Sequence, residues 1–152
     1  MFEIKLQGCV RATPQQTWAV LTDYARLPEF VPDLLSSRLL SHSAGETIIE
    51  QHGRAGFLFV RQAIYVVVRV VEQPFSSIDV TLLSGNMKHY SSHWALAPLA
   101  QGSGTRIDYR GTLEPDFFVP QFIGRVLVQR NVQSMLAAVL AEIERRALSR
   151  SP

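Results

Sequence analysis

The stretch of residues 120–146 contains no proline after Pro120 and no glycine after Gly124. Ala, Leu, Glu, Arg and Gln, which favour helix, are common in it. Its apolar residues recur at spacings of three and four, which on a helix makes one stripe: Val128, Val132, Met135, Leu136, Val139, Leu140 and Ile143. A helix of about 27 residues is roughly 40 Å long. Because no other segment predicts a long helix, we expect this stripe to lie across a large sheet.

The chain before this helix begins as a strand and continues as two short helical segments. In residues 2–11 apolar or small residues alternate with polar ones, as in a strand with one buried face. Thr13 is placed to cap a helix that starts at Pro14, with Gln16 at the capping-box position. A second short turn of helix, bracketed by prolines, is expected at residues 27–32.

From residue 34 onward the apolar pattern has a period of two. Turn sequences such as Gly85-Asn86 separate the runs, and the connections are too short for parallel crossovers. Six strands are predicted near residues 34–42, 46–55, 60–72, 76–84, 87–97 and 104–114. With the first strand they predict an α+β fold, in which a seven-stranded antiparallel sheet curves around a long C-terminal helix and two short helices follow strand 1.

Composition is typical of a compact globular domain. Of 152 residues, 47% are apolar and 18% charged, so residues 1–152 are interpreted as one ordered domain. The single cysteine excludes an internal disulfide, and the net charge of +2 gives no reason to expect DNA as a partner. A charged, strand-like start and the lack of a long apolar run argue against a signal peptide and a membrane span. A cytoplasmic location is therefore expected.

Within the sheet, the strand phases separate an inner face from an outer one. The inner face is expected to hold Ile78, Val80, Leu82, Tyr90, Trp94, Leu96, Ile107, Tyr109, Gly111 and Leu113. The outer face would carry the polar phase, including His89 and His93. Seven strands around one helix leave space between sheet and helix. The inward Gly8 and Gly111 are expected to enlarge that space, because they lack side chains.

Three stretches carry a family resemblance: Trp18-Ala-Val-Leu-Thr-Asp-Tyr24 followed by Leu27-Pro-Glu-Phe-Val-Pro32, Trp94-Ala-Leu-Ala-Pro98 followed by Thr105-Arg-Ile-Asp-Tyr109, and the C-terminal helix. They resemble the START-like or Bet v 1-like (SRPBCC) superfamily, with its helix-grip fold. Within it, the chain is most similar to the branch of polyketide cyclase/dehydrase and coenzyme Q-binding START-like proteins. The resemblance covers about residues 2–147 and implies a deep apolar cavity between sheet and helix. Relatives use that cavity for lipids, isoprenoid quinones, plant hormones or polyketides, and the fold does not decide among them.

Residue types typical of catalysis have simpler explanations here. His89 and His93 would lie on one face of a strand about 13 Å apart, too far to share a metal ion. Together with His52 they are interpreted as surface groups. Cys9 has no adjacent base that would make it a nucleophile. Neither a metal site nor a catalytic residue is predicted.

The inward aromatic residues are stronger candidates for a site. Tyr90 and Tyr109 carry hydroxyls that would orient an apolar ligand, whereas ordinary core packing is the alternative and the simpler explanation for Trp94. The predicted ligand-binding residues are Tyr90, Trp94, Tyr109, Leu113, Phe122, Val126 and Arg130. The expected ligand is a hydrophobic small molecule, such as a quinone or another lipid, and no cofactor is expected.

Three functions remain open at this level. The first is binding or transfer of a quinone, isoprenoid or other lipid. The second is a polyketide aromatase/cyclase, which needs proton-transfer groups in the pocket; the inner face offers only tyrosines and Arg130, so binding is favoured. The third is a ribosome-associated, toxin-like interaction protein, as some bacterial relatives are. There Arg145, Arg146 and Arg150 would contact RNA, although a solvated helix end is the simpler interpretation.

One segment does not fit the helix pattern. Phe122, Ile123, Val126 and Leu127 centre roughly 140° away from the stripe at 100° per residue. In one interpretation the helix starts later or kinks at Gly124, and these residues complete the core. In the other they form an apolar lip at the mouth of the cavity.

In the second interpretation, two aromatic segments extend the lip. The predicted portal or membrane lip comprises Phe57, Phe59, Phe117 and Phe118. Exposed aromatic residues would touch a bilayer transiently while ligand passes, or would seal a homodimer; the chain is otherwise expected to be a monomer. Three nearby arginines would favour anionic lipid: Arg54, Arg61 and Arg125.

Overall fold

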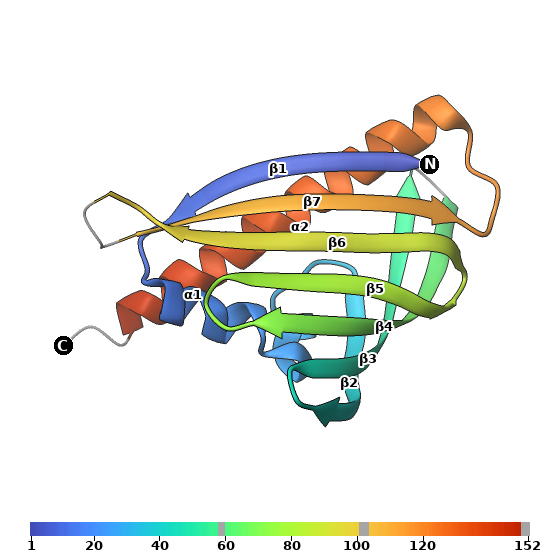
Figure 1. Cartoon of the computed structure of the whole chain (residues 1–152). Coiled ribbons are helices and arrows are strands. Elements are labelled where there is room, and N and C mark those ends of the chain that lie inside the picture. The colour runs from blue at the N-terminus through green and yellow to red at the C-terminus, as the bar shows by residue number, and fades with distance from the viewer. Residues whose placement is uncertain (58–59, 101–103, 150–152) are drawn as a thin grey trace.

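The computed structural model describes residues 1–57, 60–100 and 104–149, which form a seven-stranded sheet curved around one long helix (Figure 1). The elements are β1 (Phe2–Val10), α1 (Pro14–Leu21), the 3-10 helix η1 (Tyr24–Glu29), β2 (Leu34–Ser43), β3 (Glu46–Phe57), β4 (Val60–Gln73), β5 (Ser77–Gly85), β6 (Met87–Pro98), β7 (Thr105–Pro115) and α2 (Gln121–Ser149). Neighbouring strands are antiparallel, in the order β1-β7-β6-β5-β4-β3-β2. The predicted fold class is confirmed.

Local sequence signals account for several boundaries. At the start of α1, Gln16 N donates to Thr13 Oγ1 at 3.1 Å and Thr13 N donates to Gln16 Oε1 at 2.9 Å, which completes the predicted capping box. Gly85 has a φ of 132°, a conformation that other residues rarely adopt, and it turns the chain between β5 and β6. Asn86 then supports the turn, because Tyr65 N donates to its Oδ1 at 2.9 Å.

The second short helix lies earlier in the chain than predicted. It spans Tyr24–Glu29 rather than residues 27–32, and Pro28 is inside it. Tyr24 is buried, and its hydroxyl donates to Glu72 Oε1 at 2.5 Å. This contact with β4 is distant in sequence, so the spacing of prolines could not reveal where the segment is anchored.

The long helix α2 runs diagonally across the inner face of the sheet (Figure 1). Leu136, Val139 and Ile143 in its second half are buried, as the stripe predicted. No described helix is long and apolar enough to cross a membrane.

The two inward glycines do not enlarge the interior, contrary to expectation. A Cβ at Gly8 would lie 2.7 Å from Leu140 Cδ1, so α2 approaches β1 closely and Leu140 fills the space. A Cβ at Gly111 would lie 2.6 Å from the Tyr109 hydroxyl, so the Tyr109 ring occupies that space. Both glycines therefore permit tight packing rather than a void.

The second half of α2 is also held by an ionic cluster. Glu142 accepts hydrogen bonds from Arg145 and Arg146 at 2.7 and 2.8 Å, and Arg146 Nη1 donates to Asp23 Oδ2 at 2.9 Å. The Arg146 guanidinium lies 5.6 Å from the centre of the Phe30 ring. Hydrogen bonds from Arg145, then Arg146, lower the pKa of Glu142 to about 2 although burial opposes them. The cluster connects α2 to the segment after α1.

The first half of α2 is less deeply packed. The helix begins at Gln121 and continues through Gly124, which is buried against the Phe2 ring. The helix therefore does not start late, and Gly124 allows β1 and α2 to approach each other. Beyond this contact, the helix and the sheet separate around a cavity.

Candidate functional site

A cavity of about 310 Å³ lies between the first half of α2 and the sheet. Its walls come from all the strands except β5, from the segments that precede β2 and α2, and from α2 itself. Most of its inner surface is apolar: Phe2, Ile64, Val66, Met87, Leu113, Phe117, Leu127 and Val128. Its volume lies at the lower end of the range for small-molecule sites.

The helix side of the cavity includes polar residues. Val128 and Val132 continue the stripe but are only half-buried, since they face the cavity rather than the sheet. Asn131 and Ser134 interrupt the stripe, line the cavity and are exposed. Packing these two side chains directly against the sheet would remove their hydrogen bonds with water at a free-energy cost.

The cavity opens towards solvent beside an ion pair. Arg54 Nε lies 3.2 Å from Asp33 Oδ1, Arg54 N donates to Asp33 O at 3.0 Å, and both exposed side chains line the cavity. Asp33 has a φ of 63°, and a Cβ at Gly53 would lie 2.7 Å from its carbonyl oxygen. The mouth thus lies between this pair and the exposed Asn131 and Ser134 on α2.

Two tyrosines supply hydroxyls near the inner wall. Tyr90 on β6 lines the cavity, and Tyr109 on β7 lies behind it. Burial raises the pKa of Tyr109, and a charge on Tyr90 would raise it further. Burial also raises the pKa of Tyr90, although the nearby Ser92 and Tyr109 hydroxyls partly oppose this. Both side chains therefore remain neutral near pH 7.

The structure brings two of the predicted ligand-binding residues on the sheet to the cavity, Tyr90 and Leu113. Trp94 and Tyr109 face inward but are not among the residues that line it. Their rings pack edge to face with centres 4.8 Å apart. This pair fills the interior next to the cavity, in agreement with the packing alternative for Trp94.

The three predicted residues on α2 point away from the cavity. Phe122 and Val126 are 76% and 51% exposed, and Arg130 is exposed as well. At 100° per residue they lie on the other side of the helix from Leu127 and Val128, which line the cavity. The predicted wall is therefore corrected to Leu127, Val128, Asn131, Val132 and Ser134.

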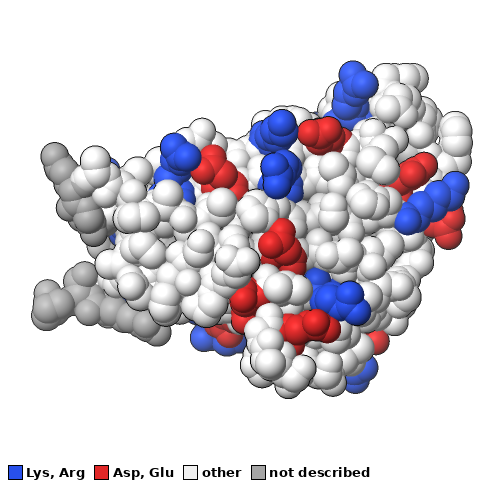
Figure 2. Space-filling model, in the orientation of Figure 1, with Lys and Arg blue, Asp and Glu red and all other residues white. Residues whose placement is uncertain are grey.

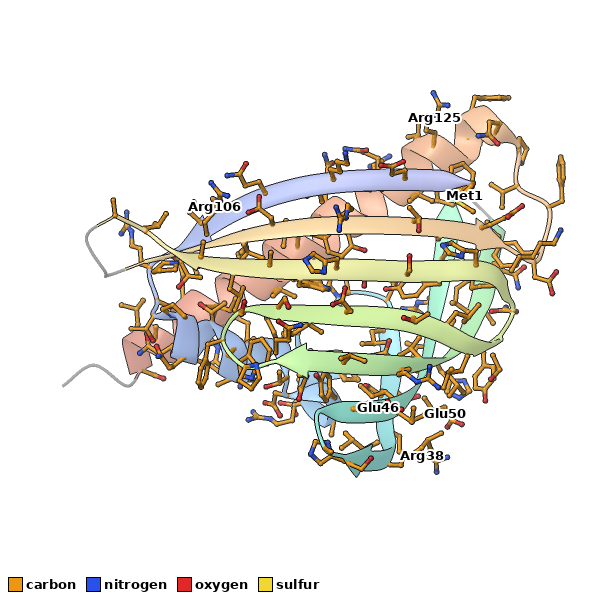
Figure 3. All side chains as sticks on the ribbon, in the orientation of Figure 1. Met1, Arg38, Glu46, Glu50, Arg106 and Arg125 are labelled. Carbon is orange, nitrogen blue, oxygen red and sulfur yellow. The ribbon has the colours of Figure 1, made fainter. Side chains whose placement is uncertain are left out.

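The residues of the predicted lip do not share one environment in the structure. Phe117 is half-buried and lines the cavity, whereas the adjacent Phe118 is 90% exposed. Phe59 and the side chain of Phe57 lie outside the described residues. Phe118, Phe122 and Val126 are exposed apolar residues at or just before the start of α2, and we call these three residues the α2 outer patch. Arg125 projects from the same part of α2 (Figure 3).

The histidines expected on the outer face have partners there. His89 Nε2 lies 2.8 Å from Thr112 Oγ1, and His93 Nδ1 lies 2.6 Å from Asp79 Oδ1. Cys9 is exposed, as its strand phase predicted. Among the described residues, no three His, Cys, Asp or Glu side chains are grouped closely enough to hold a metal ion.

Charges are mixed over the outer face. Figure 2 shows basic and acidic side chains interspersed across the sheet rather than gathered by sign. At the far end of α2, Arg145 and Arg146 are paired with Glu142, and Arg150 lies outside the described residues. The charges of Arg145 and Arg146 are thus compensated within the chain by Glu142 and Asp23.

Sequence reasoning missed four polar residues of the cavity: Asp33, Gln51, Asn131 and Ser134. Asn131 and Ser134 could have been found as polar interruptions of the apolar stripe. Asp33 and Gln51 could not, because nothing local places the β2–β3 region opposite the first half of a helix about 80 residues later.

The comparisons with known proteins agree with this architecture. Residues 10–140 match the sequence profile of the family described as polyketide cyclase/dehydrase and lipid transport. No curated protein matches the chain in sequence.

Solved structures share the fold at low identity. An aromatase/cyclase, Zhui, from a Streptomyces species is 19% identical over 95% of this chain and 94% of its own, with a TM-score of 0.81. A START superfamily protein from Mycobacterium smegmatis is 13% identical over 94% and 97%, with a TM-score of 0.80. A STAR-related lipid transfer protein from Xanthomonas axonopodis is 17% identical over 93% and 85%, with a TM-score of 0.77. At these identities the similarity shows the fold alone.

Proposed function

The chain belongs to the polyketide cyclase/dehydrase and lipid transport family, and we propose that it binds and transfers a hydrophobic small molecule in the cavity beneath α2. The observation that carries this proposal is an apolar cavity of about 310 Å³ with few polar groups. Such a lining matches the ordinary composition of small-molecule sites. Candidate ligands are quinones, other isoprenoids and acyl lipids.

The side chains of the cavity favour binding over catalysis. Among the described residues that line it, the titratable groups are Asp33, Arg54 and Tyr90. Asp33 and Arg54 are paired with each other at the mouth, which leaves Tyr90 as the titratable group of the inner wall. General acid–base chemistry uses a group whose pKa lies near the operating pH, whereas burial raises that of Tyr90.

An aromatase/cyclase is the second candidate, supported by the structural similarity to the Streptomyces enzyme. In that function, Tyr90 would donate a hydrogen bond to a substrate carbonyl and so polarise it. The two candidate functions differ in the fate of the bound molecule. A carrier releases it unchanged, whereas a cyclase releases a chemically altered product.

We further propose that ligand exchange takes place at a membrane surface. The α2 outer patch exposes Phe118 and Phe122 beside Arg125. Its apolar residues suit the acyl boundary of a bilayer, and the arginine suits anionic headgroups. Because the first half of α2 covers the cavity, its insertion into the interface would bring the cavity next to lipid.

The binding proposal is tested by native mass spectrometry of freshly purified protein, followed by organic extraction. We expect a co-purified lipid or quinone. Ala55→Trp should exclude it because Ala55 lines the cavity, whereas Ala137→Trp on the exposed side of α2 should retain it. Equal ligand content in both folded variants would contradict the proposal. A chemically altered molecule recovered after incubation with a polyketide substrate would favour the cyclase.

The membrane proposal is tested by co-sedimentation with vesicles of anionic and neutral lipid. We expect Phe118→Ser/Phe122→Ser to reduce pelleting with anionic vesicles several-fold. Leu148→Ser is the matched control, since Leu148 is 76% exposed at the other end of α2, the same fraction as Phe122. Equal, negligible pelleting of wild type and variant would remove the proposal. A concentration-dependent mass that the double change abolishes would instead indicate a homodimer through the same patch.

A further inference from the structure

Three hydroxyl groups meet on the inner wall of the cavity. Tyr90 and Ser92 are two residues apart on β6, so both face the interior, and Ser92 lies opposite Gly111 of β7. Tyr109 also faces inward, and its hydroxyl occupies the space over Gly111 that a Cβ would fill. The missing side chain at Gly111 therefore brings the Tyr109 hydroxyl beside Ser92 and Tyr90.

This cluster has more hydrogen-bond donors than it uses. Each hydroxyl has one hydrogen to donate, so three hydroxyls use all their donors on one another only in a closed ring of three hydrogen bonds. An open chain of three makes two hydrogen bonds and leaves one donor unused. Ser92 Oγ is buried without a hydrogen-bond partner of good geometry among the described residues, so the ring is not closed. A buried hydroxyl without a partner is costly, which makes this wall ready to accept a polar atom from outside the chain.

Tyr90 is the member of the cluster that lines the cavity. Tyr109 and Ser92 lie behind it, because the Tyr109 hydroxyl occupies the space over Gly111 and Ser92 lies opposite Gly111. The Tyr90 hydroxyl is therefore the group of the cluster that can donate a hydrogen bond to a ligand in the cavity.

The residues around the cavity determine whether the polar group of a ligand on the inner wall is charged or neutral. The tyrosines stay neutral, and the charged residues that line the cavity, Asp33 and Arg54, pair with each other at its exposed mouth. A carboxylate or phosphate on the inner wall would lose its hydration without a cation to compensate.

We propose that the ligand is an apolar molecule with a neutral carbonyl oxygen, as in a ketone, an ester or a quinone, which enters carbonyl first and accepts a hydrogen bond from Tyr90. This inference rests on the proposed binding function and specifies its ligand class. The Tyr109 and Ser92 hydroxyls lie behind Tyr90, and the apolar remainder of the ligand occupies the space up to the mouth.

The test uses three probes of one shape: 2-acetylnaphthalene, 2-ethylnaphthalene and 2-naphthoate. Each is titrated against protein preloaded with the fluorescent apolar probe N-phenyl-1-naphthylamine. We expect wild type to bind the ketone about 5-fold tighter than the hydrocarbon, the size of one neutral hydrogen bond, and the carboxylate most weakly. Tyr90→Phe should abolish the ketone preference while leaving the affinity for 2-ethylnaphthalene within about 2-fold.

Tyr65→Phe is the matched control. Tyr65 adjoins the cavity residues Ile64 and Val66 in sequence, and the alternation of the strand turns it to the other face of the sheet, where its hydroxyl lies 3.4 Å from Glu50. This variant should keep the ketone preference. Equal binding of ketone and hydrocarbon by wild type, a preference that survives Tyr90→Phe, or tightest binding of the carboxylate would each overturn the inference while leaving the binding function intact. Failure of wild type to bind N-phenyl-1-naphthylamine at all would instead overturn the proposed function.

Discussion

Replacing Gly111 with alanine tests how the inner wall is built. A Cβ at this position would lie 2.6 Å from the Tyr109 hydroxyl oxygen, 3.0 Å from Cζ and 3.2 Å from Cε1. The ring cannot move aside easily, because Tyr109 is buried and packs edge to face against Trp94. Gly111→Ala must therefore shift a packed aromatic pair.

The expected cost combines two opposing effects. Overpacking of a core side chain costs about 1–3 kcal/mol, whereas replacing glycine by alanine in a strand returns about 0.5–1 kcal/mol. We expect Gly111→Ala to lower the free energy of unfolding by about 1–2 kcal/mol. Urea denaturation followed by tryptophan fluorescence measures it, and Trp94 emission should also change in the folded state.

A double-mutant cycle shows whether the hydroxyl is responsible. In Tyr109→Phe the nearest atom is absent, so Gly111→Ala should cost about 1 kcal/mol less in that background than in wild type. The reasoning is refuted if the two changes are additive within about 0.3 kcal/mol, or if Gly111→Ala stabilises the protein.

Three further changes test other parts of the structure. Leu136→Ala should lower the free energy of unfolding by about 2–5 kcal/mol because Leu136 is buried under the sheet; a loss below about 1 kcal/mol in urea melts would mean that the core face is misassigned. Glu142 has a pKa lowered to about 2, so its ionic contribution is complete above the ordinary pKa of about 4.5 and disappears as pH falls towards 2. Glu142→Gln should flatten the fall in urea midpoint over that interval, and an unchanged slope would show that other carboxylates cause it. Thr13→Ala should cost about 1 kcal/mol by removing the side-chain acceptor for Gln16 N, while Thr13→Ser, which keeps the acceptor, should cost less in the same melts.

Most strands and helices could be predicted from the sequence, because the patterns that indicate them involve residues close together in the chain. Alternation in β1 assigned its buried face, and the capping box at Thr13 marked the start of α1. The short connections required an antiparallel sheet, which the structure shows. Only the 3-10 helix was displaced, since the contact of Tyr24 with Glu72 crosses 48 positions of the chain.

The site was less readable from the sequence. The phase of each strand indicated which residues face inward, and Tyr90 and Leu113 do line the cavity. The same reasoning expected the inward Gly8 and Gly111 to add space, although Leu140 fills the space at Gly8 and Tyr109 fills the space at Gly111. Where a cavity remains in the folded protein depends on the volumes of side chains from distant segments. The apolar periodicity of the sequence does not indicate which of those side chains meet.

The sequence by itself determined the element order, the antiparallel sheet and the buried stripe of α2, because hydrogen bonding and apolar periodicity act between near neighbours. Only the tertiary structure decided where the cavity lies. It also decided that Phe122 and Val126 face outward and that the ion pair of Asp33 and Arg54 lies at the opening of the cavity. Those outcomes depend on the angle at which α2 crosses the sheet. That angle is set by close packing at Gly8 and Gly124 and by the ion pair between Arg146 and Asp23, all of which join residues far apart in the chain.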